Sequence, residues 1–247
     1  MNRNVNAFGL ALIVALAMTA VFASGAQAQI KVTTGSSPAW LTGEPIGHPN
    51  ITGNIHTLTL AGGQVVTCEE IKFTSTVSSG ATQVTVVPSY KKCAVKIGSE
   101  KFPATVTMND CDYVLHGGVE VSSTTFKEGE VDLLCPTGIS VEIHVYKKEP
   151  HIKENELCTY FVAPFVNKKA NEFHNVAGSP NDVTITTTAT GIAVTRTGSL
   201  LCGATPTTAT YTGSTTVKAF EDMGGTISNG TVTGLVEGAQ VSLTASK

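Results

Sequence analysis

The sequence predicts an all-β protein, an antiparallel sandwich or barrel-like fold with about three disulfides. The 247 residues include 36 Thr, with frequent Val and Gly, and such residues favour strands and tight turns over helices. Short runs of alternating apolar and polar residues are separated by turns, and no segment keeps the period of an amphipathic helix. Six cysteines, an even number, all lie beyond a predicted export signal.

The first 28 residues are typical of a secretory signal peptide. One basic residue, Arg3, precedes an uncharged apolar run over 7–23, and Ala26-Gln27-Ala28 is a small-x-small cleavage site. The run is shorter than the roughly 20 apolar residues of a membrane span, which favours cleavage over a retained anchor. We therefore expect a secreted, extracellular protein that starts at Gln29 and has no membrane span after cleavage.

Composition divides the rest of the chain into three parts. Residues 29–54 contain three prolines and the only Trp, and they predict an extended N-terminal segment. Residues 55–220 predict the disulfide-stapled β domain. Residues 221–247 predict a C-terminal β-hairpin tail, because Asn229-Gly230 between two matched runs is the strongest short hairpin signal in the chain.

The β domain begins with an expected hairpin over 64–93, which turns at Ser78-Ser79-Gly80 and has a cysteine near each end. Centring the turn there places Cys68 two residues out of register with Cys93. The apolar residues change parity after Cys68, so we expect a bulge at Glu69-Glu70 that corrects the offset.

Alternation and turn residues predict the other strands of the β domain. Gly-Gly, Lys-Glu-Gly-Glu and Cys-Pro-Thr-Gly sequences mark turns between several of them. The expected strands are 56–60, 104–115, 119–126, 131–135, 141–145, 158–166, 183–190, 192–197 and 208–220.

The cysteine spacing favours disulfides over a metal site, because no C-x-x-C or H-x-x-H sequence occurs. Of the many possible pairings we expect the sequential one. Cys68–Cys93 follows from the first hairpin, Cys111–Cys135 from neighbouring strands, and Cys158–Cys202 from elimination.

Six segments carry a resemblance: VTCEEIKF, VPSYKKC, ATVTMNDCDYVL, LLCPTGISVEI, LCTYFVAPF and ATYTGSTTVKAF. Their succession, over about residues 55–220, resembles a set of uncharacterised secreted six-cysteine β-proteins of high-GC Gram-positive bacteria. The resemblance implies export, the cysteine pattern and β content, and it supplies no functional residue.

The formal net charge of −3 is mild, and 14% of the residues are charged. This balance argues against nucleic acid and against an anionic membrane as electrostatic partners. No nucleophile elbow and no phosphate loop occurs. We therefore expect no catalytic residue and no cofactor, and a hydrolase is only the third function considered.

Two groups of polar residues are candidates for binding. His144 with Glu142, helped by His151, is the best metal candidate, but a solvated strand face is favoured and no metal is expected. Three lysine pairs, two of them after a Tyr, would form an anion or glycan patch if they converged, although separate solvated positions are favoured. The pairs are Lys91-Lys92, Lys147-Lys148 and Lys168-Lys169.

Two functions remain. The first is an exported, non-enzymatic β-protein with a structural or cell-surface role, favoured by low charge, Thr-rich faces and disulfides. The alternative is an extracellular module that binds a glycan, such as one of the cell envelope, or a small ligand. An aromatic content of 6% with a single Trp weakens the glycan reading, because sugar sites use exposed aromatic rings.

Overall fold

The structure is a computed structural model, and almost all of the described chain is strand, which confirms the all-β prediction. It describes residues 29–33, 39–45, 56–78, 80–177, 182–221, 226–228, 231–233 and 240–246, with side chains described over 56–78, 80–177 and 182–218. In this part of the chain there is no α-helix, and the two 3₁₀ helices are η1 (Lys153–Asn155) and η2 (Leu200–Cys202). The strands are β1 (Gln29–Thr33), β2 (Ala39–Pro45), β3 (Thr57–Leu60), β4 (Val65–Val77), β5 (Gln83–Ile97), β6 (Glu100–Thr107), β7 (Asp112–His116), β8 (Val119–Ser122), β9 (Thr125–Leu134), β10 (Val141–Tyr146), β11 (Glu156–Val162), β12 (Phe165–Asn175), β13 (Asp182–Gly198), β14 (Thr208–Glu221), β15 (Thr226–Ser228), β16 (Thr231–Thr233) and β17 (Gln240–Ser246).

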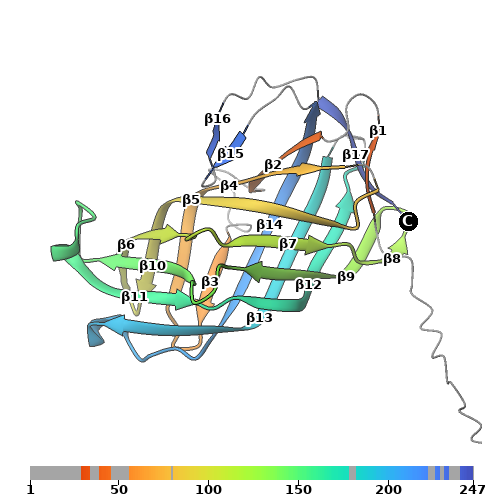
Figure 1. The fold of residues 1–247 in the computed structure, drawn as a ribbon. Coiled ribbons are helices and arrows are strands. Elements are labelled where there is room, and N and C mark those ends of the chain that lie inside the picture. The colour runs from red at the N-terminus through yellow and green to blue at the C-terminus, as the bar shows by residue number, and fades with distance from the viewer. Residues whose placement is uncertain are drawn as a thin grey trace, which may run out of the picture.

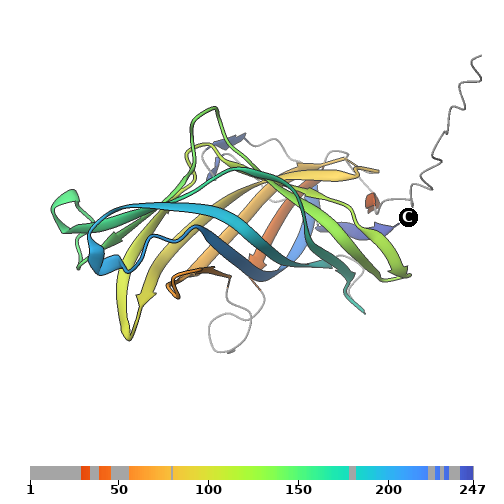
Figure 2. The same cartoon turned by 90° about the horizontal axis from the view of Figure 1, so that it is seen from below.

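Eight strand positions close into one antiparallel barrel (Figure 1 and Figure 2). Four positions hold the long strands β4, β5, β13 and β14. The other four each hold two shorter strands placed end to end, namely β6/β7, β10/β9, β11/β12 and β3/β2. The order is β4, β5, β6/β7, β10/β9, β11/β12, β13, β14 and β3/β2, which pairs with β4 again. Of the two expected architectures, the structure is therefore the barrel.

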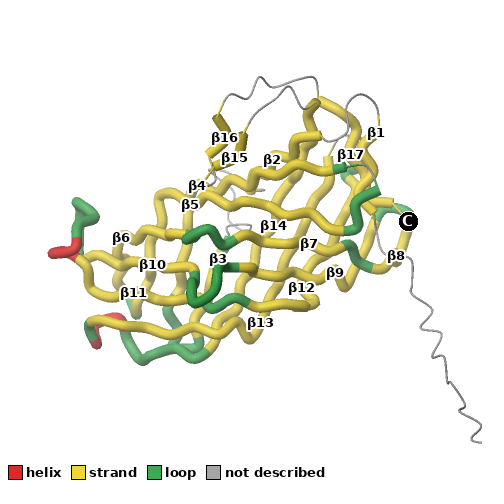
Figure 3. The backbone as a smooth tube through the Cα atoms, viewed as in Figure 1, coloured by secondary structure: helices red, strands yellow, loops and turns green. Residues whose placement is uncertain are grey.

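Three of these interruptions, in β6/β7, β10/β9 and β11/β12, lie next to one another, because the strands on both sides of them are paired. Figure 3 shows them as loops between β6 and β7 and between β9 and β10. Residues 108–111 separate β6 from β7, and 135–140 separate β9 from β10. Ala163-Pro164 separates β11 from β12, where Pro164 has no N–H for the ladder. On this side of the barrel, the wall thus consists of two sets of short strands that follow each other end to end: β6, β10 and β11, and then β7, β9 and β12.

Two expected turns lie inside continuous strands instead. The Lys127–Glu130 turn is part of β9, where Glu128 has a φ of 58°. The turn at Gly191 is part of β13, and it forms a bulge between Ala189 and Ile192. In both places a residue with positive φ shifts the register without reversing the chain. The turn residues at these two places therefore mark an irregularity within a strand and not a reversal of the chain.

The three disulfides form in the expected pairs, and no cysteine is free. The register of the first pair differs from the prediction, however. Cys68 lies directly opposite Cys93, and the register is the same on both sides of Glu69-Glu70. The expected bulge there is wrong, because the turn is centred later than assumed, with the Ala81 N–H donating to the Ser78 carbonyl.

The parity change after Cys68 occurs in both strands at the same level. On β4 the buried positions pass from Cys68 to Ile71, three residues on. On β5 they pass from the lumen-facing Tyr90 to buried Cys93, and Lys92 between them has a φ of 50°. Because both strands change face together, the ladder keeps its register.

The segments on either side of the β domain contribute strands as well. Residues 29–54, expected to be extended, contain β1 and β2, and β2 pairs with β4 and β14 in the barrel wall. The expected tail hairpin is confirmed by the pairing of β15 with β16, where Ser228 lies opposite Thr231. β17 adds to β14 and β1. The predicted signal peptide over 1–28 lies outside the described residues.

The interior of the barrel holds two separate apolar clusters. The larger cluster includes the fully buried Val95, Leu133, Val145, Tyr160 and Val194. The smaller cluster consists of Val77, Val84, Val86, Phe126, Phe173, Val183, Ile185 and Val217. In the described chain only the partly buried Phe73, Tyr113 and Leu115 pack against both. The two clusters therefore do not merge into one continuous core.

Candidate ligand-binding cavity

A cavity of about 130 Å³ lies inside the barrel between the two clusters. All eight strand positions contribute to its wall, with Cys68 and Ile143 from the larger cluster and Val86 and Phe173 from the smaller. Among the residues described, no Asp, Glu, Lys or Arg lines it. The wall is therefore apolar except for a few neutral polar groups.

Half of these polar groups belong to an aromatic cluster on one side of the cavity. His56, Phe73, Tyr90, Tyr113 and Tyr211 all line it, and they come from four strands and the residue before β3. The His56 ring centroid lies 5.6 Å from that of Phe73 and 5.7 Å from that of Tyr211. Phe73 meets Tyr90 edge-on at 6.2 Å, and Tyr113 stacks on Tyr211 at 6.4 Å. These contacts fix the direction of every ring.

His56 is a neutral side chain whose tautomer follows from its partners. Its Nε2 lies 3.1 Å from the Ser214 carbonyl oxygen and 3.0 Å from the Thr215 hydroxyl. A carbonyl only accepts, so Nε2 carries the proton and Nδ1 accepts from the Tyr211 hydroxyl. Burial lowers the pKa of His56 from 6.5 to about 4, against the opposing effect of the bond to Ser214. At neutral pH the ring is uncharged.

The three tyrosine hydroxyls form one hydrogen-bonded group. The hydroxyl oxygens of Tyr90 and Tyr113 are 3.3 Å apart, and the Tyr90 hydroxyl also hydrogen-bonds to Tyr211. Burial is the largest cause that raises the pKa of each of the three hydroxyls. All three therefore remain protonated and neutral, and they present hydrogen-bonding groups without charge to the cavity.

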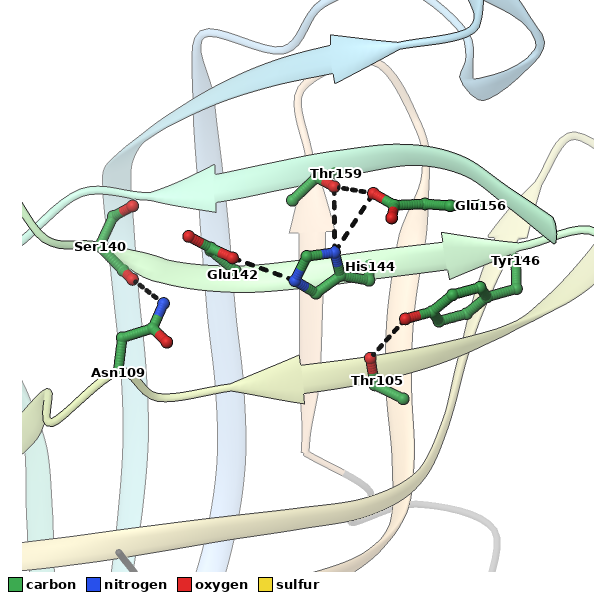
Figure 4. Close-up of polar contacts among 8 residues, drawn as sticks. All are labelled: Thr105, Asn109, Ser140, Glu142, His144, Tyr146, Glu156 and Thr159. Carbon is green, nitrogen blue, oxygen red and sulfur yellow. Dashed lines mark hydrogen bonds and ion pairs between the residues drawn. The ribbon is translucent and has the colours of Figure 1, made fainter. Parts of the chain in front are cut away.

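The metal candidate from the sequence lies on the outer face of β10 and β11 (Figure 4). His144 Nε2 is 3.0 Å from Glu142, and its Nδ1 is 3.2 Å from Glu156 and 3.2 Å from the Thr159 hydroxyl. Thr159 also donates to Glu156, which is the main reason why the pKa of Glu156 is lowered. Because both ring nitrogens of His144 already face carboxylates, neither has a lone pair directed at an open metal position.

His151, the expected helper of that site, lies elsewhere. Its ring stacks on Tyr146 with centroids 4.8 Å apart, and its Nε2 is 2.7 Å from Glu149. Over the described residues, no three His, Cys, Asp or Glu side chains come together as potential metal ligands. The structure thus brings together two of the three candidate residues, His144 and Glu142, in a hydrogen bond on the surface.

The lysine pairs lie on β5, in the loop after β10 and on β12, and these strands are not hydrogen-bonded to one another. Lys92 forms an ion pair with Glu70, and Lys169 Nζ is 3.6 Å from Glu128. All four side chains are well exposed. The arrangement is that of separate solvated positions, which was the favoured expectation.

Neither a family model, nor a curated protein, nor a solved structure matches this chain. The resemblance to secreted six-cysteine proteins therefore stays a prediction. A search of the described residues for helices found none that is long and apolar enough to cross a membrane.

The residues around the cavity were not identified from the sequence. The sequence predicts Tyr90 and Tyr113 as members of alternating strands, Tyr90 also as the neighbour of a lysine pair, and His56 as the start of a strand. Tyr211 lies 155 positions from His56, so no local pattern connects them. The only available signal was the presence of aromatic and polar residues at positions that alternation assigns to the inside.

Proposed function

We propose that this protein is an exported binding protein that holds a small apolar ligand in its barrel. The observation that carries the proposal is the cavity between two separate apolar clusters. Protein interiors are usually close-packed, with few voids larger than a water molecule. A ligand that fills a cavity of this kind gains van der Waals contacts with the apolar wall and buries apolar surface of its own.

The chemistry of the wall also supports binding of a small molecule. Such sites are mostly apolar, with a few polar groups that fix the orientation of the ligand. Here four of the polar side chains form the aromatic cluster on one side, and the lining residues from β9 to β13 across from it are apolar except for Thr187. A ligand would therefore be held by burial and oriented by one polar end.

Export is part of the same proposal. Three disulfides within one domain are typical of proteins from oxidising compartments, and the predicted signal peptide points to the same destination. We place the binding function outside the cytoplasm on these grounds.

The other expected functions have less support. A structural or cell-surface role gives no reason for the cavity, and it stays a prediction. A glycan would need many polar partners, and the cavity wall is mostly apolar. On the outer face, Tyr146 is buried and covered by His151, so it offers no open stacking platform.

The proposal is tested with a tryptophan that fills the cavity. Leu115 lines the cavity and packs against both clusters, so Leu115→Trp should occupy the ligand's space. Thr85→Trp on the exposed face of β5 is the matched control. We expect α-methylstyrene, a small neutral hydrocarbon, to bind the wild type and the control in calorimetry, but not Leu115→Trp. Equal binding by both variants, or none by the wild type, would contradict the proposal.

A further inference from the structure

The hydrogen bonds that join His56 to the three tyrosines run in one direction only. His56 Nε2 donates to the Ser214 carbonyl, so Nδ1 is an acceptor and takes the proton of Tyr211. Each hydroxyl supplies one proton, so the bond between Tyr90 and Tyr211 uses that of Tyr90. The bond between Tyr113 and Tyr90 then uses that of Tyr113. A single backbone carbonyl thus fixes the direction of every hydrogen bond from Tyr113 to His56.

Tyr113 is the first member of this chain of hydroxyls, and its oxygen is left without a donor. The oxygens of Tyr90 and Tyr211 each accept one hydrogen bond from the preceding tyrosine. Among the described residues no N–H or O–H donates to the Tyr113 oxygen, whose own proton is already used. Tyr113 lines the cavity and is one of three residues that pack against both apolar clusters. The three tyrosines therefore offer a ligand a hydrogen-bond acceptor and no free hydroxyl proton.

Resting on the binding function proposed above, we propose that the ligand is a neutral alcohol or phenol whose hydroxyl donates its proton to the Tyr113 oxygen. A hydroxyl group brings one donor, which is the partner that this oxygen lacks. A ketone, an aldehyde or an ether brings only acceptors, so at Tyr113 two oxygens would meet without a proton between them. The ring or alkyl part of the ligand lies against the apolar wall.

The ligand is neutral because nothing at the cavity would balance a charge. No Lys, Arg, Asp or Glu lines the cavity in the described chain, and His56 is uncharged at neutral pH. A buried ion without a partner is strongly disfavoured. This excludes a carboxylate ligand. An aliphatic amine also brings donors, but it is protonated at neutral pH and is excluded in the same way.

The size of the cavity limits the ligand to about one ring with a short substituent. A cavity of about 150 Å³ lined by aliphatic and aromatic residues accepts benzene, and the volume here is about 130 Å³. Benzyl alcohol, a ring with a short alcohol, fits this description. Benzaldehyde has the same non-hydrogen atoms, but its oxygen can only accept a hydrogen bond. The two probes therefore differ chiefly in whether the oxygen carries a proton.

The experiment measures both probes by calorimetry on the wild type, Tyr113→Phe and the control Tyr146→Phe. Tyr146 lies outside the cavity lining, so its variant loses a hydroxyl elsewhere. We expect Tyr113→Phe to bind benzyl alcohol about fivefold more weakly than the wild type does, which is the worth of one hydrogen bond. Its affinity for benzaldehyde should stay the same, because Tyr90 still donates to Tyr211 and no hydroxyl proton is freed. The control should bind both probes as the wild type does.

The outcomes separate the two proposals. If neither these probes nor α-methylstyrene bind the wild type, the binding function itself fails. If α-methylstyrene binds but benzyl alcohol does not, the cavity takes a ligand of another class. The assignment to Tyr113 is also wrong if Tyr113→Phe keeps its full affinity for benzyl alcohol, or loses affinity for benzaldehyde to the same degree. Tighter binding of benzoate or of benzylammonium than of benzyl alcohol would overturn the neutral character.

A measurement on the wild type alone covers the case in which Tyr113→Phe does not fold. Toluene has the same ring as benzyl alcohol but no hydroxyl group, so it binds by burial alone. The affinity of benzyl alcohol relative to toluene should exceed their relative transfer from water to an alkane by about fivefold or more, because only the alcohol gains a hydrogen bond. A ratio equal to that of the transfer would overturn the assignment to Tyr113.

Discussion

At the scale of single residues, His56 decides the electrostatic character of the cavity wall. Its Nε2 donates to the Ser214 carbonyl, and its Nδ1 accepts from Tyr211. Burial holds its pKa near 4, far below the usual range for histidine. One neutral ring therefore orients the tyrosine hydroxyls without adding a charge to an apolar interior.

The buried neutral His56 should make stability depend on pH. The unfolded chain binds a proton at this residue below pH 6.5, but the folded protein does so only below about pH 4. The unfolding free energy should therefore fall by about 3 kcal/mol as the pH falls from 6.5 to 4. His56→Gln, which does not titrate, should lack this part of the slope in urea unfolding at pH 7 and pH 4.5.

Other titrating groups, including Glu156, are present in both proteins and cancel in that comparison. Equal slopes in the wild type and His56→Gln would show that His56 is not held neutral by burial.

At the scale of elements, two of the strand interruptions coincide with a disulfide. Between β6 and β7, and between β9 and β10, the ladder is broken at neighbouring positions. Cys111–Cys135 joins the two breaks, and the Asn109 side chain donates to the Ser140 carbonyl at 3.0 Å. Cys68–Cys93, by contrast, joins two strands that are paired on both sides of it.

Removing either disulfide should lower the global stability by a similar amount. The two closed loops span 25 and 24 residues, and loop-closure entropy assigns about 3.5 kcal/mol to each. We expect this loss in urea unfolding of the paired alanine variants at Cys68/Cys93 and at Cys111/Cys135. A variant as stable as the wild type would contradict the entropic account.

The two variants should differ in local protection. Faster amide exchange over 108–111 and 135–140 is expected only when Cys111–Cys135 is removed, because no ladder holds those residues. Equal exchange there in both variants would show that the breaks do not depend on the disulfide.

At the scale of the whole molecule, the barrel is closed by pairs between distant parts of the chain. β14 pairs with β13 on one side and with β2 and β3 on the other, and these in turn pair with β4. Closure places the inward residues of all eight positions around one lumen. The cavity is thus a property of the closed barrel and of no single strand.

Export also predicts which residue comes first in the mature protein. Cleavage after Ala28 would leave the first described strand intact, because β1 begins at Gln29. We expect N-terminal sequencing of secreted material to begin at Gln29 or within a few residues of it. Cytoplasmic protein that still begins with Met1 would contradict export and the oxidising compartment with it.

The sequence by itself determined the strand content, most strand positions and the cysteine pairing. Alternation and β-branched residues are local signals, and hairpin neighbours such as Cys68 and Cys93 are close along the chain. Only the tertiary structure decided between barrel and sandwich, and only it revealed the cavity. Closure depends on the pairing of β14 with β2 and β3, and the cavity's polar group joins His56 to Tyr211 across 155 positions. Such contacts leave no periodic trace in the sequence, because each partner alone is an ordinary inward residue of a strand.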